Sequence, residues 1–292
     1  MRKVWHALIA GLVLVLAACG STSGNNGGNN TVGSESALDN VVASEAPVNK
    51  ALLAMGQAAL AQGMPIPVPV FLSLSPLSEP LTLDTHSWNC SGVVATGDLS
   101  DHDNDGIPAN AKYSGNCSVT DNGQTATWKL NFNLKDNNDS DPFSGYVANG
   151  TITWEVVGQA KLVWAIDNHS VIRNSSGDYN LTYKGSWAYT DYTNATNDET
   201  VNYDFSGNWT PDPGNNPETW ADVMSGPGTL NISGNFNGSC SDGGTFTVTL
   251  NSLNVHINAS GCANNGNVNV NSTSCEGSHY SGSVSWSSCA GQ

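Results

Sequence analysis

Positive charge is scarce in this chain: 9 lysines and arginines stand against 25 aspartates and glutamates among 292 residues. Two of the nine, Arg2 and Lys3, fall in an N-terminal segment that we expect to be removed. Such a surface repels phosphate backbones and offers no basic stripe, so we expect no nucleic-acid partner. Divalent cations and neutral ligands remain compatible with it.

Catalytic signatures are also missing. No H-E-x-x-H, G-x-S-x-G or phosphate-loop pattern occurs, and the histidines are scattered along the chain. No two cysteines have C-x-x-C spacing, which argues against a zinc or thiol-redox site. We therefore expect a non-enzymatic protein. A hydrolase whose paired acids lie far apart in the sequence remains a third hypothesis.

Membrane-spanning runs are lacking as well, because the apolar run from Ala7 to Ala17 is shorter than the roughly 20 residues that a bilayer requires. A basic start precedes it, as in a signal peptide. The run ends in Leu16-Ala17-Ala18-Cys19, which resembles the lipobox of bacterial lipoproteins. The resemblance implies cleavage before Cys19 and acylation of that residue with diacylglycerol and a fatty acid such as palmitate, which anchors the chain permanently. The alternative is an ordinary secretory signal with a cysteine there by chance.

The residue after Cys19 is Gly20 rather than an aspartate, which favours the outer membrane over the inner membrane of the cell envelope. Six further cysteines form an even set, which in an exported chain predicts disulfide bonds without fixing their pairing. They are Cys90, Cys117, Cys240, Cys262, Cys275 and Cys289.

Composition divides the chain into four segments: a signal peptide (residues 1–18), a Gly- and Asn-rich flexible tether (19–36), a helix with a proline-rich extended strap (37–84) and a β domain (85–292). The helix is predicted to begin near Pro47 and to end at Gly63. Its apolar residues recur at helical spacing and predict a packing face, formed by Val48, Leu52, Met55, Ala59 and Leu60.

The β domain shows apolar residues at every second position, as in Trp128, Leu130, Phe132 and Leu134. Short polar turns separate such segments, and no helical pattern intervenes. We predict a mainly β fold: an antiparallel meander of roughly ten strands that forms a closed or nearly closed barrel, with a β-sandwich as the second choice. A change of phase at Asn251 and Ser252 predicts a β-bulge.

Aspartates gather between Cys90 and Cys117. Asp101, Asp103 and Asp105 followed by Gly106 form D-x-D-x-D-G, which resembles the first half of an EF-hand loop and the calcium repeats of thrombospondin type 3 modules. The resemblance implies a calcium site, completed by the backbone carbonyl of Ile107. The second half departs from the pattern, since Ala109 and Lys112 replace ligand positions 9 and 12.

Asp98 is a candidate substitute for a missing ligand, and the incomplete set predicts weak calcium affinity. The alternative is an acidic, solvated loop without metal. Cys90 and Cys117 are placed symmetrically about a point between Asp103 and Asn104, which predicts a disulfide across a β-hairpin with this loop at its tip.

Aromatic residues supply one further candidate site, because Trp187, Tyr189 and Tyr192 are suited to a groove for sugar rings or for an apolar ligand. Strand aromatics also commonly fill a core. The leading hypothesis is a non-enzymatic cell-envelope lipoprotein with a calcium- and disulfide-stabilised β domain. The second is a lipid- or glycan-binding carrier with a barrel pocket. The oligomeric state stays open.

Overall fold

The computed structural model describes residues 32–33, 37, 40–41, 44–64, 92–121, 124–195, 198–214, 216–240 and 243–289. The predicted signal peptide with Cys19, most of the predicted tether, the proline-rich strap and Cys90 lie outside these residues. Val32, from the end of the predicted tether, is buried, and its amide donates to the carbonyl of Leu99 at 3.1 Å.

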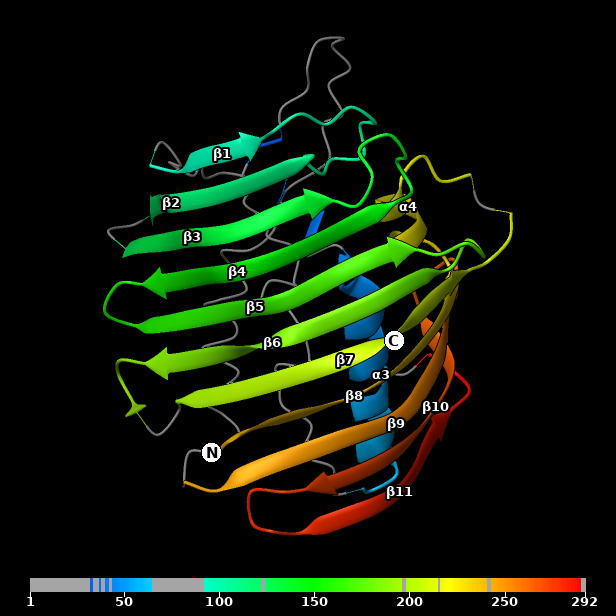
Figure 1. Cartoon of the computed structure of the whole chain (residues 1–292). Coiled ribbons are helices and arrows are strands. Elements are labelled where there is room, and N and C mark those ends of the chain that lie inside the picture. Colours follow the sequence, from blue (N-terminus) through cyan, green and yellow to red (C-terminus); the bar gives the residue numbers. More distant parts are fainter. Residues whose placement is uncertain are drawn as a thin grey trace.

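A single antiparallel sheet of 11 strands dominates the structure, with the strands arranged in sequence order (Figure 1). Each strand therefore pairs only with its neighbours in the chain, which confirms the predicted meander. The strands are β1 (Val94–Asp98), β2 (Asn110–Asp121), β3 (Gln124–Asp136), β4 (Gly145–Val156), β5 (Ala160–Arg173), β6 (Tyr179–Asp191), β7 (Glu199–Pro211), β8 (Gly228–Ser239), β9 (Thr245–Ile257), β10 (Ala263–Thr273) and β11 (His279–Trp286).

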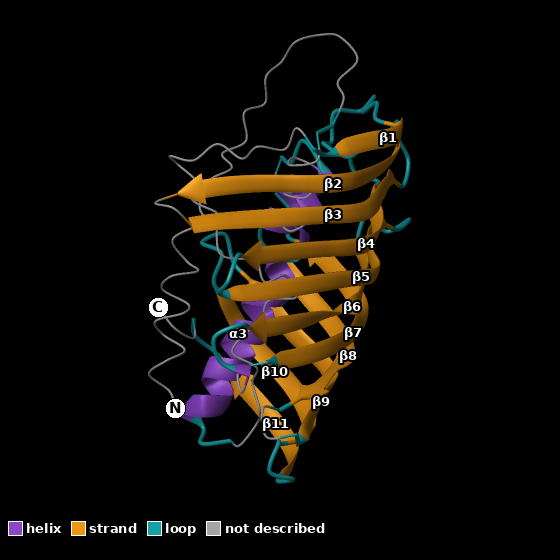
Figure 2. Cartoon of the chain, turned by 90° about the vertical axis from the view of Figure 1, so that its left-hand side faces the viewer, coloured by secondary structure: helices purple, strands orange, loops and turns teal. Residues whose placement is uncertain are grey.

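The sheet is twisted and curved, but it does not close: β1 and β11 form its two ends (Figures 1 and 2). The predicted barrel is therefore wrong, and so is the two-sheet sandwich. A barrel closes when the first strand meets the last, which buries the inward-facing side chains. Here a helix on the concave face helps to bury them instead, so the apolar residues are covered without closure.

That helix is α3 (Ala46–Ala61), which runs across the strands on the concave side (Figure 2). The predicted apolar face is confirmed at Val48, Leu52, Met55 and Ala59, all of which are buried. Leu60 differs, since it is 65% exposed.

Gly63 ends α3 as predicted, with a positive φ of 67° that a residue with a side chain rarely adopts. The amide of Gly63 donates to Leu60 O at 3.0 Å, and the amide of Met64 donates to Ala59 O at 2.9 Å. This pair of bonds is a Schellman motif, which satisfies two of the last carbonyls of the helix.

Helix α3 contacts β8, β10, β11 and a second, short helix, α4 (Trp220–Ser225). Its N-terminus reaches the middle of the sheet, where Tyr183 Oη donates to Ser44 O at 2.9 Å. Aromatic rings dominate the interior at this level, and Trp164, Trp209 and Trp220 are each almost fully buried. The N-terminal segment is thus an integral part of the core.

The predicted bulge in β9 is confirmed. The register against β8 shifts between the pairs of Leu250 and Leu253, and Ser252 has a positive φ of 61°. The apolar residues change from even to odd positions at this point in the sequence. The extra residue of the bulge compensates for that change, so the apolar residues before and after it are buried on the same face.

Disulfides fasten the C-terminal end of the sheet. Cys240 bonds Cys275, and Cys262 bonds Cys289, across 35 and 27 residues of sequence. Cys117 is also disulfide-bonded, and its predicted partner Cys90 lies outside the described residues. Disulfides of this number favour an extracytoplasmic location. Within the described chain, no helix has the length and hydrophobicity to cross a membrane.

Candidate metal centre

The aspartate-rich loop connects β1 to β2 at the end of an antiparallel hairpin, as predicted. The register differs by one residue: Val94 pairs with Ser114 and Asp98 with Asn110, which centres the hairpin on Asn104. The symmetric placement of Cys90 and Cys117 therefore predicted the hairpin correctly and the register of its two strands wrongly by one residue. The predicted bond between these two cysteines stays a prediction.

A second loop approaches the first, since alternate loops of a meander lie at the same edge of the sheet (Figure 1). This loop joins β3 to β4 and begins after Asp136. The amide of Asp136 donates to Pro108 O at 3.1 Å, and the amide of His102 donates to Asp139 Oδ1 at 2.8 Å. The two loops are thus held together by a backbone hydrogen bond and by the Asp139 carboxylate, which contacts both the amide and the imidazole of His102.

Within the first loop, the aspartates turn inward onto the backbone. Asp101 accepts hydrogen bonds from the amides of Asp105 at 3.2 Å and Gly106 at 3.1 Å. Gly106 has a φ of 84° and Asn104 a φ of 63°, conformations that glycine and asparagine tolerate best. The tight turn brings alternate carboxylates around one point, as the sequence pattern predicted.

Two overlapping acidic clusters result. Carboxylate oxygens of Asp101, Asp103 and Asp105 lie within 4.8 Å of one another, and so do those of Asp103, Asp136 and Asp139. Asp103 belongs to both clusters, so the two loops contribute to one continuous group of oxygen ligands.

Several of these oxygens are buried and unsatisfied. Asp105 is 4% exposed and Asp136 is 2% exposed. Among the described residues, Oδ2 atoms of Asp103, Asp105 and Asp136 are buried without a hydrogen-bond partner. Burying a carboxylate oxygen without compensation is costly, and a bound cation is the usual compensation for several of them together.

The pKa values of the centre also favour a bound cation. Burial, followed by repulsion from Asp136, raises the pKa of Asp103 to about 6. Burial also raises the pKa of Asp105 to about 8, against a hydrogen bond from the Ile107 amide that lowers it. The pKa of Asp136 is raised by burial as well. The metal-free folded state therefore holds protons that a cation would displace.

The acidic clusters differ from the predicted set of calcium ligands. Asp98 is not a member of either described cluster: its Oδ1 accepts from the amide and hydroxyl of Ser100, at 3.1 and 2.5 Å. Ile107 is fully buried, and its amide donates to Asp105 Oδ1 at 2.8 Å. Asp136 and Asp139 were missed, because the sequence pattern of one loop does not show which other loop lies beside it.

The aromatic candidates occupy different environments. Trp187 and Tyr189 are 3% and 8% exposed and belong to the core, whereas Tyr192 is 47% exposed. The hydroxyl of Tyr192 donates to Glu155 Oε1 at 2.9 Å. Ligand binding by these three residues stays a prediction.

No family model, curated sequence or solved structure matches the chain.

Proposed function

We propose that this chain is a non-enzymatic structural domain of a bacterial cell envelope, lipid-anchored through Cys19, in which Ca²⁺ clamps the β1–β4 end of the sheet. The observation that carries the proposal is the set of buried, unsatisfied carboxylate oxygens on Asp103, Asp105 and Asp136. The disulfides at the other end of the sheet support the extracytoplasmic location.

Calcium fits the ligands better than other common ions. It takes roughly 6 to 8 oxygen ligands in flexible geometry, and two loops offer carboxylates here. Zinc prefers nitrogen and sulfur, and neither cluster contains a histidine or a cysteine. Magnesium requires a near-octahedral shell and usually retains several waters, which suits a group of buried carboxylates less well.

The clamp stabilises the sheet because it joins two hairpins. The first cluster, Asp101, Asp103 and Asp105, lies in the loop after β1. Asp136 is the last residue of β3, and Asp139 lies in the loop that follows it. A cation that binds both groups links the loops more strongly than backbone hydrogen bonds alone, and it removes the repulsion among the carboxylates. The incomplete EF-hand pattern is thereby completed from another strand.

The test is thermal unfolding of the oxidised protein in EGTA and in calcium. We expect calcium at about 100 times its Kd to raise Tm by roughly 5–10 °C. Asp105→Asn removes a carboxylate ligand that burial keeps protonated below about pH 8, so it should abolish the calcium-induced shift and raise Tm in EGTA only above that pH. Asp136→Asn should also abolish the shift if the second loop takes part.

Asp98→Asn is the matched control, since Asp98 has the same chemistry near the same loop but lies outside both clusters. This variant should keep the full calcium shift. If wild-type Tm is the same in EGTA and in calcium, or if only Asp98→Asn abolishes the shift, the proposed centre is wrong.

A further inference from the structure

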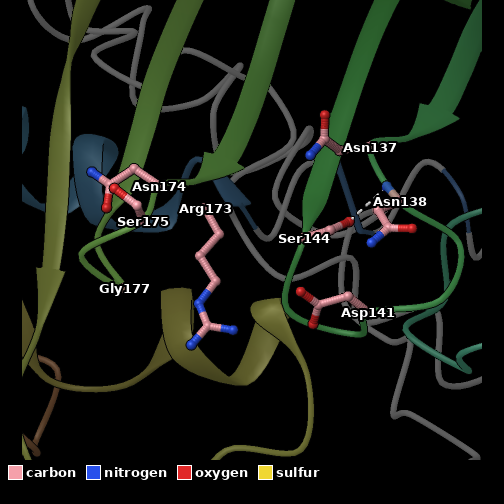
Figure 3. A pocket seen from close by; sticks show the side chains of 8 residues that line it. All are labelled: Asn137, Asn138, Asp141, Ser144, Arg173, Asn174, Ser175 and Gly177. Carbon is pink, nitrogen blue, oxygen red and sulfur yellow. Dashed lines mark hydrogen bonds between the residues drawn. The ribbon is translucent and has the colours of Figure 1, made fainter.

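A polar cavity of about 360 Å³, wide open to solvent, lies between the β3–β4 loop and the turn after β5 (Figure 3). Both segments are at the same edge of the sheet as the acidic clusters. The residues that matter for its chemistry are Asn137, Asn138, Asp141, Arg173, Asn174 and Ser175.

Arg173 is the main charged donor of this cavity. It is the sole arginine outside the predicted signal peptide, in a chain with 25 acidic residues. Its guanidinium stacks over the ring of Phe143, 5.3 Å from the centroid, and forms no ion pair within the described part of the chain. Stacking on an aromatic ring orients the planar group and leaves its N–H donors available for a ligand.

Asp141 contributes the opposite charge. Its Oδ1 accepts from the amide of Phe143 at 3.1 Å, and Figure 3 shows its carboxylate directed into the cavity. One arginine and one aspartate give the lining no net charge, in contrast to the strongly acidic chain as a whole. A neutral lining favours a ligand without net charge.

The remaining groups are side-chain amides and a hydroxyl. Amide, carboxylate and guanidinium groups are planar and present two hydrogen-bonding atoms side by side, which matches neighbouring hydroxyls on a sugar ring. We propose that this cavity binds a neutral saccharide unit, with Arg173 donating to its hydroxyls and Asp141 accepting from them. The proposal does not require calcium, although Asp136, which fixes one wall of the cavity, also belongs to an acidic cluster.

The walls of the cavity are fixed before a ligand arrives. The amide of Asn138 donates to Asp136 Oδ1 at 2.9 Å and to Ser144 Oγ at 3.0 Å. On the opposite side, Asn174 Oδ1 accepts from the amide of Ser176 at 2.9 Å. Such pre-organisation reduces the entropic cost of binding.

Ligand-observed NMR and calorimetry with the methyl glycosides of glucose, galactose, mannose and N-acetylglucosamine test the proposal. At least one of the four should bind to the oxidised full chain. Arg173→Lys retains the charge but loses the planar fork, and Asp141→Asn retains the acceptor for Phe143 but loses the charge. Each should weaken binding about tenfold to a hundredfold.

Lys184→Gln is the control, because it removes a positive charge from an exposed ion pair with Asp204, at 3.0 Å, outside the cavity. Its affinity should equal that of the wild type. Melting curves identify any variant that fails to fold, and Arg173→Lys is chosen because it preserves the stacked cation. The proposal is overturned if none of the four glycosides binds, if Arg173→Lys and Asp141→Asn both bind as tightly as wild type, or if glycine or glucuronate binds in their place.

Discussion

At the scale of single residues, a few buried carboxyl groups are expected to make the stability of the protein depend on pH and on calcium. Asp105 and Asp98 have the same side chain and are seven positions apart. Burial raises the pKa of Asp105 to about 8, whereas hydrogen bonds from Ser100 lower the pKa of Asp98. Local geometry separates one acidic group that strongly favours a proton or a cation from one that is stable as a free carboxylate.

The stability of the metal-free protein should therefore fall as the pH rises. Between about pH 4 and pH 8 the folded state holds protons on Asp103 and Asp105 that the unfolded state has released, since their folded pKa values are about 6 and about 8. The free energy of unfolding decreases with pH wherever the folded state binds more protons. Melting curves in EGTA from pH 5 to pH 9 measure this slope.

Calcium should reverse the trend, because it competes with protons for the same oxygens and binds more tightly as the pH rises. The calcium-induced rise in Tm is thus expected to grow from pH 5 to pH 8. Asp105→Asn should flatten the EGTA profile, and Asp98→Asn should leave it as in the wild type. A metal-free Tm that increases over the whole range would contradict the assignment of these buried acids.

At the scale of secondary-structure elements, helix α3 is fixed to the sheet by a buried polar contact at its N-terminus. Glu45 Oε1 and His169 Nδ1 are 2.8 Å apart, and neither residue has any exposed surface. The two atoms are in close contact, but neither has an aligned hydrogen bond within the described residues. Tyr203 Oη lies 2.8 Å from His169 Nε2 and accepts from Trp164 Nε1 at 2.7 Å, so the contact extends across β5 and β7.

Removal of one partner should destabilise the whole domain. Burial raises the pKa of Glu45, and its closest charged neighbour is His169. Glu45→Ala leaves the imidazole of His169 buried without that neighbour, and a buried polar group that loses its partner costs about 1–3 kcal/mol. Chemical denaturation should show a lower midpoint for this variant. Leu60→Ala, on the exposed side of the same helix, should change stability by no more than about 0.5 kcal/mol.

If Glu45→Ala unfolds at the same denaturant concentration as Leu60→Ala, the buried contact does not hold the helix. Circular dichroism in the absence of denaturant shows whether both variants retain the native content of strand and helix.

At the scale of the whole molecule, two disulfides lie near one end of the open sheet, and the acidic centre and the disulfide-bonded Cys117 of β2 lie near the other. Two disulfides tie the β8–β11 end, and in the chain-entropy model loops of 35 and 27 residues contribute about 3.5–4 kcal/mol each. The acidic centre lies at the β1–β4 end. Edge strands lack a neighbour on one side and tend to open first, so a cation at the acidic centre would add protection to the β1–β4 end alone.

Hydrogen exchange should reveal this division. Transfer from calcium to EGTA is expected to accelerate exchange in β1–β3 and to leave β9–β11 unchanged. Reduction of the disulfides in calcium should accelerate exchange most in β9–β11, where two of them lie, and less in β2, where Cys117 is bonded but calcium still holds the loops. Uniform acceleration across the sheet under either treatment would show that the two ends are not independent.

The sequence predicted features that depend on neighbouring residues. The two-residue alternation in β3, the helix from Pro47 to Gly63 and the bulge at Ser252 are all local patterns, and the structure contains them. Features that depend on which surfaces meet were missed. Closure of the sheet was predicted because alternation is the same in barrels and in open sheets, and only the position of α3 distinguishes them.

The candidate site shows the same limit. Asp101, Asp103 and Asp105 are close because they share one turn, which their spacing predicts. Asp136 joins them because β3 returns to the same edge of the sheet, a consequence of topology. In a meander, alternate loops lie at the same edge of the sheet, so acidic residues in alternate loops are candidates for a shared site.

The strand order also has a consequence for how the chain folds. Every strand pairs with the strands that precede and follow it in the sequence. The pairings within the sheet therefore join nearby segments, which gives a low contact order for an all-β sheet. Folding can begin at any hairpin and proceed outward one strand at a time, as in repeat proteins. The sheet can then form from several starting hairpins. The slowest step is expected to be the docking of helix α3, because its partners β8, β10 and β11 are more than a hundred residues away in the sequence.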